Sequence, residues 1–400
     1  MESYFVDWLN LLFRWLHLIT GAAWIGTSFY FNWLNHNLRP PSDEERKNQG
    51  IAGELFAVHG GHFYQVSKYA GAPAKLPKTL HWFKWEAYFT WITGICLLFI
   101  VYYWNPNTYL RPLDATADWS AGWAICLGLG SLVLSWLIYD VLCKSSLIRM
   151  PVLFSSLGFV LIGGLAYFFA QKFGSRAAYI HLGATLGTIM AANVFFVIIP
   201  NQQIMVNAMM AGEAPDTSLG DQGALRSLHN NYFTLPVLFI MISNHYPMTY
   251  GHQSNWMILI ALSVIGAGAR HYFNLKHKGH HKVWILPAAA IAMMALAFVS
   301  RPVNRVVTDN STASIVYKDI HPIIVKRCQP CHATHPNFMG FTAPPQGIIY
   351  ETPQQVKAVV DKIKAQAIDA QIMPPGNLTK ITEEERALLG RWIETGAKLE

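Results

Sequence analysis

The sequence contains few charged residues and few cysteines for its length. Of its 400 residues, 13% are Asp, Glu, Lys or Arg, whereas 52% are hydrophobic and 14 are Trp. Soluble domains carry about 25% charged residues, so this composition excludes an ordinary soluble protein. Five cysteines in 400 residues exclude a fold held together by a disulfide framework. The net charge of +7 indicates no nucleic-acid partner, because much of it lies in short loops beside apolar segments.

Long apolar stretches recur through the first 300 residues, each near the length needed to cross a hydrocarbon core about 30 Å thick. We predict eight membrane spans, at residues 5–31, 81–104, 120–142, 151–171, 178–199, 231–246, 254–275 and 283–299. The first stretch has no basic region before it and is too long for a signal peptide, so we expect it to remain as a helix. This part of the chain is thus predicted to lie within a lipid bilayer.

One motif near the C-terminus indicates a specific cofactor. Cys328 and Cys331, followed by His332, form a Cys-x-x-Cys-His motif, which is the attachment site of a c-type haem. The thiols can bond the two vinyl groups of one porphyrin, with His332 under the iron, and Met373 is the candidate for the second axial iron ligand. A zinc site would need two more Cys or His ligands at suitable spacing. His335 is nearby, but no second Cys-x-x-Cys pair follows, so the sequence favours haem over zinc.

The segment that holds this motif differs in composition from the apolar part of the chain. We predict a membrane domain at 1–305 and a second domain, of mixed charge with Pro and Gly, at 306–400. Its order is a helix with the haem motif, a methionine loop and a C-terminal helix that starts at a capping box, Thr382 to Glu385. This order resembles a class I cytochrome c. The predicted fold class is all-α, a polytopic membrane bundle of about eight helices followed by a class I cytochrome c domain.

The orientation of the bundle follows from two arguments. Haem is attached to c-type cytochromes outside the cytoplasmic membrane, so the C-terminal domain is expected in the periplasm, and an even number of spans places the N-terminus there too. The connections on the cytoplasmic side then contain twelve Lys or Arg residues and those on the periplasmic side five, as the positive-inside rule requires. Haem attachment and loop charge therefore predict the same orientation.

Histidines within the predicted spans are costly to bury and are therefore candidates for function. His17 and His181 lie in the first and fifth spans, within weakly similar surroundings, on helices that run in the same direction. Helix bundles can hold a haem between histidines on facing helices, so this pair could bind a second, non-covalent haem b. His245 could join or replace either of them. The alternative is that each histidine hydrogen-bonds to a neighbouring helix.

A second polar group is predicted at the cytoplasmic level. Its members are His59, His62, His81, Lys84, Glu86, Arg226, His229, Asn230, Arg270 and His271, of which His59, His62, Glu86, Arg226 and Arg270 are the candidate site residues. The planar fork of an arginine matches a planar anion, and a histidine or a glutamate can act as a base. The structural alternative is that the cations lie at the membrane interface and cap helix ends.

The whole chain resembles the bacterial membrane-bound urate oxidase (urate hydroxylase) family, in which a C-terminal cytochrome c follows a multi-span domain. The resemblance is carried by Arg-Trp-Leu-His at 14–17, Trp-Ile-Gly at 24–26, His-Trp-Phe-Lys-Trp-Glu at 81–86, Pro-Asn-Gln at 200–202, Asn-Asn-Tyr-Phe-Thr-Leu-Pro at 230–236 and Ser-Asn-His-Tyr-Pro at 243–247. It implies conversion of urate to 5-hydroxyisourate, with electrons passed to a cytochrome and not directly to oxygen. It also implies a location in the bacterial inner membrane and a cytochrome c or terminal oxidase as the acceptor.

Within this resemblance the position of the substrate is open. Arg226 or Arg270 could hold the urate anion, and His59, His62 or Glu86 could take a proton. A site at the cytoplasmic level would require a relay across the bilayer, such as the second haem, whereas a site near the periplasm would need none. The competing class is a respiratory module that oxidises quinol, and a third is a transporter or haem-handling bundle with a redox sensor. The cationic cluster favours an anionic substrate over quinol.

Overall fold

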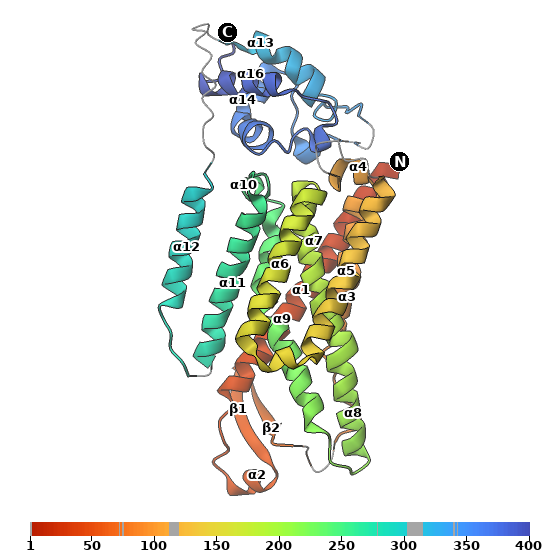
Figure 1. Ribbon diagram of the computed structural model, residues 1–400, viewed down its shortest axis with the longest axis vertical. Helices are drawn as coiled ribbons and strands as arrows, with labels where there is room; N and C mark the ends of the chain where they lie inside the picture. The colour runs from red at the N-terminus through yellow and green to blue at the C-terminus, as the bar shows by residue number, and fades with distance from the viewer. Residues whose placement is uncertain are drawn as a thin grey trace.

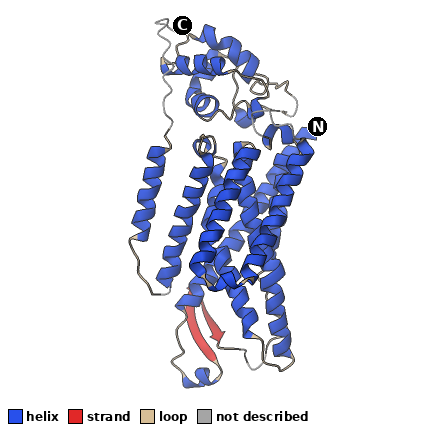
Figure 2. Cartoon of the chain, in the orientation of Figure 1, coloured by secondary structure: helices blue, strands red, loops and turns tan. Residues whose placement is uncertain are grey.

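The computed structural model describes residues 2–71, 73, 76–111, 120–277, 279–301, 315–338, 341 and 343–400. It is an elongated, mostly helical molecule in which long helices lie side by side, with a smaller helical domain at one end and a hairpin at the other (Figures 1 and 2). The N-terminus lies at the same end as the C-terminal domain (Figure 1). The C-terminal domain and the hairpin therefore lie at opposite ends of the bundle.

The bundle consists of long helices joined mostly by short connections. Its helices are α1 (Glu2–Asn37), α3 (Trp85–Leu98), α5 (Ala121–Lys144), α6 (Pro151–Lys172), α7 (Ser175–Asn193), α8 (Ile199–Met210), α9 (Thr217–Ser243), α11 (Asn255–His277) and α12 (Ile285–Val299). Short helices are α2 (Glu44–Asn48), α4 (Pro106–Tyr109) and α10 (Pro247–Tyr250). π-helical turns at Phe99–Tyr103 and Val194–Ile198 continue α3 and α7.

Five of these helical segments are long and apolar enough to cross a membrane. They are Trp85–Tyr103, Ala121–Lys144, Pro151–Lys172, Ser175–Met210 and Asn255–His277, and they coincide with five of the eight predicted spans. The other three predicted spans are helical as well, in α1, α9 and α12. However, α1 and α9 carry more polar side chains, and the 15 residues of α12 reach only about 22 Å.

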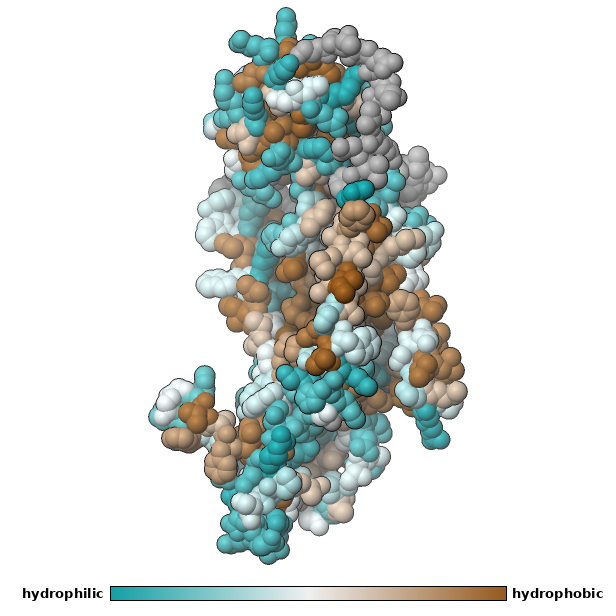
Figure 3. All heavy atoms as spheres, turned by 90° about the vertical axis from the view of Figure 1, so that its left-hand side faces the viewer, coloured by the Kyte–Doolittle hydropathy of each residue, from teal (hydrophilic) through white to brown (hydrophobic). Residues whose placement is uncertain are grey.

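The surface of the bundle suits a hydrocarbon environment. Large apolar side chains are exposed along its helices, among them Leu134, Val160 and Ile291. In Figure 3 such side chains cover the middle of one face, while hydrophilic ones gather towards the hairpin end. Because lipid removes the penalty for apolar exposure, this distribution is expected of a membrane-embedded bundle.

The prediction of an all-α chain is wrong in one segment. Strands β1 (Ile51–His59) and β2 (His62–Tyr69) form an antiparallel hairpin in which His59 pairs with His62. Gly60 and Gly61 form the two-residue turn, with φ of 60° and 78°. A turn of this kind requires positive φ at both positions, which glycine adopts without strain. The Gly-Gly pair between two runs rich in aromatic and β-branched residues was the available sequence signal.

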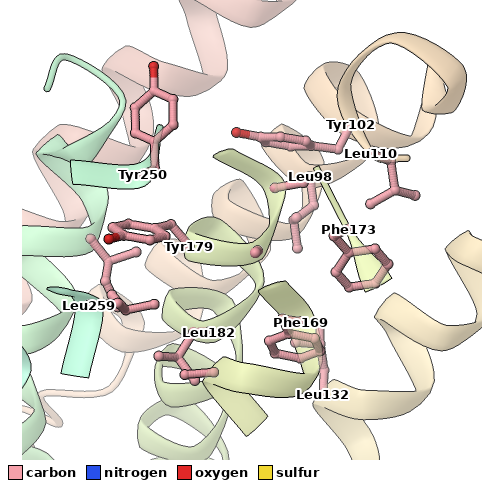
Figure 4. Close-up of a cluster of buried hydrophobic side chains, with 14 of the residues drawn as sticks. Leu98, Tyr102, Leu110, Leu132, Phe169, Phe173, Tyr179, Leu182, Tyr250 and Leu259 are labelled. Carbon is pink, nitrogen blue, oxygen red and sulfur yellow. The ribbon is translucent and has the colours of Figure 1, made fainter. Parts of the chain in front are cut away.

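The centre of the bundle is α7, which packs against α5, α6 and α9. Figure 4 shows Phe169, Phe173, Tyr179 and Leu182 in its hydrophobic core, all less than 2% exposed. Small residues let the helices approach closely, as is usual in membrane bundles. At Gly183 a Cβ atom would lie 2.5 Å from Ile240 Cγ2 of α9, so no larger residue fits there.

The C-terminal domain has a hydrophobic core of its own. It contains α13 (Tyr317–Ile323), α14 (Pro353–Ala358), α15 (Val360–Ile363) and α16 (Glu383–Glu394), with π-helical turns at Ile324–Cys328 and Lys364–Asp369. Ile320 and Ile324 of the first helical segment pack with the fully buried Leu389 and Trp392 of α16. The capping box predicted at Thr382 and Glu385 is confirmed, because the Thr382 hydroxyl accepts from the Glu385 amide and the Glu385 carboxylate accepts from the Thr382 amide.

The two parts of the molecule meet closely at one glycine. A Cβ at Gly251, which follows α10, would lie 2.4 Å from the Ala370 Cβ of the C-terminal domain and 2.8 Å from the Pro247 carbonyl oxygen. We expect Gly251→Ala to separate this contact, because overpacking costs about 1–3 kcal/mol. Hydrogen–deuterium exchange should then rise around Ala370. Gly268→Ala is the control, since nothing lies within 4 Å of a Cβ there. Equal exchange in both variants would contradict this account of the contact.

Candidate functional site

The haem motif lines a cavity of about 330 Å³ between the C-terminal domain and the end of the bundle. Cys328, Cys331, His332 and Met373 all border it, so the four predicted haem ligands and attachment residues are brought together around one space. The bundle contributes Thr108, Tyr109, Arg111, Ser175, Arg176, Asn244 and Tyr250 to the opposite wall. We call this space the motif cavity.

His332 is held in an orientation that suits a metal ligand. Its Nδ1 lies 2.9 Å from the Ile348 carbonyl oxygen, to which it can donate a hydrogen bond. The ring nitrogen Nε2 is then the free, unprotonated one, as in most iron-binding histidines. The Tyr350 ring packs against it at 4.8 Å between centroids. Burial lowers the pKa of His332, which keeps the imidazole neutral and able to bind iron.

The remaining members of the motif cavity are also fixed by local contacts. The Met373 carbonyl accepts a hydrogen bond of 2.8 Å from Nη1 of the buried Arg386, which holds the methionine loop against α16. Arg327, next to Cys328, forms an ion pair with Glu385 at 2.9 Å and so ties the motif to the same helix. Burial, followed by the nearby Cys331, raises the pKa of the Cys328 thiol to about 12. The donor set and its surroundings therefore fit a covalently attached haem.

Of the histidines predicted to bind a second haem, His181 does not fit that group. His181 is fully buried, with Nδ1 2.8 Å from the Ala177 carbonyl oxygen and Nε2 2.9 Å from the Tyr103 hydroxyl, so both ring nitrogens are already engaged. A Cβ at Gly128 would lie 2.9 Å from the same Nε2, which leaves no slot for a porphyrin there. His17 faces α3 through Thr90 and Thr93, and His245 is exposed.

A second cavity, of about 620 Å³, lies towards the hairpin end of the bundle. Its walls come from α1, the segment before α3, the end of α7 with its π-helical turn, the start of α8 and the middle of α9. The polar lining residues are Thr27, Ser28, Asn32, Asn35, His36, His81, Gln202, Ser227, Asn230, Asn231 and Thr234, and the aromatic ones are Trp24, Phe31, Trp82 and Phe83. We call this space the amide cavity.

Four of the strings that carry the family resemblance converge on the amide cavity. Trp24 and Ile25, the segment 81–83, Gln202, and the segment 230–234 all contribute lining residues. These strings are far apart in the sequence and meet here because α9 packs against both α1 and α8. π-helical turns such as Val194–Ile198, which also borders this cavity, are frequent at functional sites.

The residues predicted to act on the substrate are distributed over four places. His59 and His62 lie exposed at the hairpin turn and do not line the amide cavity. Glu86 is in the first turn of α3, outside the cavity lining. The buried guanidinium of Arg226 is paired with Asp140 at 2.7 Å.

Arg270 lies behind the cavity wall. It is 5% exposed and donates through Nε to the Asn231 oxygen Oδ1 at 2.8 Å. Asn231 itself lines the amide cavity, so Arg270 acts on that space through one amide. The asparagines Asn32 and Asn231 were not predicted as site residues. The available signal was the cost of placing amides inside spans.

The two cavities are separated by most of the length of α7. Ser175 at its start borders the motif cavity, and Met190 borders the amide cavity. Ser175 and Met190 are 15 positions apart, which corresponds to about 22 Å along the helix axis.

The fold and the two cavities define a multi-pass α-helical membrane protein with a small helical domain at one end. Comparison with protein families identifies it further. The chain belongs to the family described as urate oxidase N-terminal, which matches residues 3–301 and thus the whole bundle. Comparison with curated proteins and with solved structures gives no match. The family suggests oxidoreductase activity on urate.

Proposed function

We propose that the protein oxidises urate to 5-hydroxyisourate in the bacterial inner membrane and passes the electrons to a c-type haem on the same chain. The family of residues 3–301 supports urate as the substrate. One observation carries the haem part of the proposal: Cys328, Cys331, His332 and Met373 border a single cavity that opens against the bundle. Residues 306–400 would then be a periplasmic cytochrome c domain.

The proposed reaction balances without oxygen as the oxidant. One urate monoanion and one water give one 5-hydroxyisourate, one proton and two electrons. Haem c, when bound, supplies a one-electron acceptor, so two cycles of its reduction and reoxidation are needed for each urate. A cytochrome c or a terminal oxidase would receive the electrons next.

The chain's own residues prepare the motif cavity for this role. Cys328 and Cys331 would attach the haem, and His332 would offer Nε2 to the iron because its Nδ1 is held by the Ile348 carbonyl. Met373 would provide the thioether on the other face. The N-terminus and the C-terminal domain lie at the same end of the bundle (Figure 1), as an even number of spans requires. His181 is excluded as a ligand of a second haem, since it has no free ring nitrogen, and His17 and His245 remain the candidate ligands for such a relay.

The electron acceptor distinguishes this function from others. We expect the purified protein to consume urate rapidly when an oxidised c-type cytochrome is present, and slowly with oxygen alone. The measurements are the loss of urate absorbance, the reduction of the added cytochrome and the yield of hydrogen peroxide. Peroxide formed in proportion to urate would contradict the proposal. Reduction by a quinol analogue but not by urate would favour the respiratory module.

A further inference from the structure

We infer that the amide cavity binds the substrate, as a flat anionic purine held between aromatic side chains and hydrogen-bonded to asparagine amides. This inference rests on the proposed function and adds the location and the residues of the substrate site. It places urate at the end of the bundle opposite the motif cavity.

The aromatic wall is formed by residues from two separate segments. Phe83 packs edge-on against Phe31 of α1 at 4.8 Å between ring centroids and against His81 at 4.5 Å. Phe31 and Phe83 are 43% and 48% exposed, so neither ring is buried in the core of the bundle. Trp24 and Trp82 border the same space. Aromatic faces of this kind stack against a flat heterocycle, and the cavity of about 620 Å³ is of the size usual for small ligands.

The asparagine amides that line the cavity supply hydrogen-bonding groups for a ligand. Asn231 is 4% exposed, and its amide nitrogen Nδ2 has no hydrogen-bond partner in the part of the chain that the structure describes. A buried amide without a partner costs free energy, which a ligand with a carbonyl oxygen would recover. Asn32, across the cavity, donates to Asn274 at 3.1 Å and keeps its own oxygen as an acceptor. Urate offers carbonyl oxygens and ring N–H groups to both kinds of partner.

The charge behind the wall selects an anion. Arg270 is 5% exposed and rests on the Phe29 ring at 4.1 Å, and no carboxylate pairs with it among the described residues. Arg226 has a similar depth in the same bundle but is neutralised by Asp140 at 2.7 Å. Burying a cation without a counter-ion costs free energy. The difference between these two arginines therefore indicates that the anionic partner of Arg270 comes from outside the chain. Urate at neutral pH is a monoanion and would supply that charge, relayed by Asn231.

Equilibrium binding of urate to the holoprotein in detergent tests this inference. We expect Arg270→Gln to raise the dissociation constant of urate at least about tenfold, because it removes the buried positive charge that Asn231 relays to the anion. Arg149→Gln removes the same charge from an exposed residue, outside the cavity lining, and should leave binding unchanged. Phe83→Ala removes an exposed ring and should weaken binding without affecting the fold, which covers the case in which the Arg270 variant is misfolded.

The outcomes separate the inference from the proposed function. Wild-type protein that neither binds urate nor is reduced by it would reject the proposed function. Wild-type protein that binds and oxidises urate, with unchanged dissociation constants in the Arg270 and Phe83 variants, would reject the amide cavity as the site. In that case Arg176→Gln should weaken binding, because Arg176 borders the motif cavity, which is the other place where urate could lie.

Discussion

The double variant Cys328→Ala/Cys331→Ala is expected to contain no covalently bound haem and to transfer no electrons from urate to an added cytochrome. Both thiols border the motif cavity beside His332, and they are the groups through which a c-type haem is attached. The loss should be complete, because a haem without thioether bonds would dissociate during purification. A pyridine haemochrome spectrum after acid–acetone extraction measures the covalent fraction directly.

The sequence provides a matched control for this variant. Cys126 is an exposed cysteine of α5, outside the lining of both cavities, and Cys126→Ala should retain one covalent haem per chain. Covalent haem in the double variant would contradict the assignment of the motif. Normal urate-driven cytochrome reduction without any haem would contradict the proposed electron path.

The second large effect is expected in stability. Asp140 of α5 and Arg226 of α9 form an ion pair of 2.7 Å, with side chains 10% and 5% exposed. Arg226 also donates to Asn193 of α7, so the pair joins three helices. Asp140→Leu leaves the guanidinium buried without its partner, which costs about 3–5 kcal/mol. We expect a markedly lower unfolding temperature in detergent, measured by differential scanning fluorimetry.

Two further variants show whether charge is the cause. Asp140→Leu/Arg226→Met removes both charges and should recover much of the stability, because an apolar pair is often as stable as a buried ion pair. Glu44→Gln breaks an exposed ion pair with Lys47, whose side chains are 78% and 44% exposed, and should change stability by less than about 1 kcal/mol. Equal losses in the single and double Asp140 variants would show that packing, and not charge, dominates.

Much of the architecture follows from local patterns in the sequence. The apolar runs at 120–142 and 151–171 became α5 and α6 with ends within a few residues, because a helix in lipid needs only length and hydrophobicity. The capping box at Thr382 was recognisable from two residues at fixed spacing. The hairpin at 51–69 was missed, although its Gly-Gly turn is a local signal.

The candidate sites depend on contacts that no local pattern contains. Cys328 and His332 are adjacent in sequence, so the motif could be recognised, but the approach of Arg176 and Asn244 to the same cavity is a property of the packed domains. Arg226 and Arg270 look alike in sequence. Only the structure shows that Asp140, 86 residues away, pairs with the first and not with the second. The distinction between an arginine with a carboxylate partner and one without is therefore a tertiary one.

Separation of the two cavities by about 22 Å makes electron transfer the central requirement of the account. If urate is oxidised in the amide cavity, its electrons must reach the haem in the motif cavity without release of an intermediate. Aromatic and histidine side chains, among them Tyr103, His181 and Phe173, occupy the core between the two ends. Electron transfer between the two cavities can be measured as the number of haems reduced by each urate.

The most direct test is an anaerobic titration of the oxidised, purified protein with urate, followed in the visible absorption of haem c. The account predicts that each urate reduces two haems when protein is in excess, with formation of one 5-hydroxyisourate. Cytochrome that remains oxidised while urate is bound, and urate that is consumed only after oxygen is admitted, would contradict the central claim.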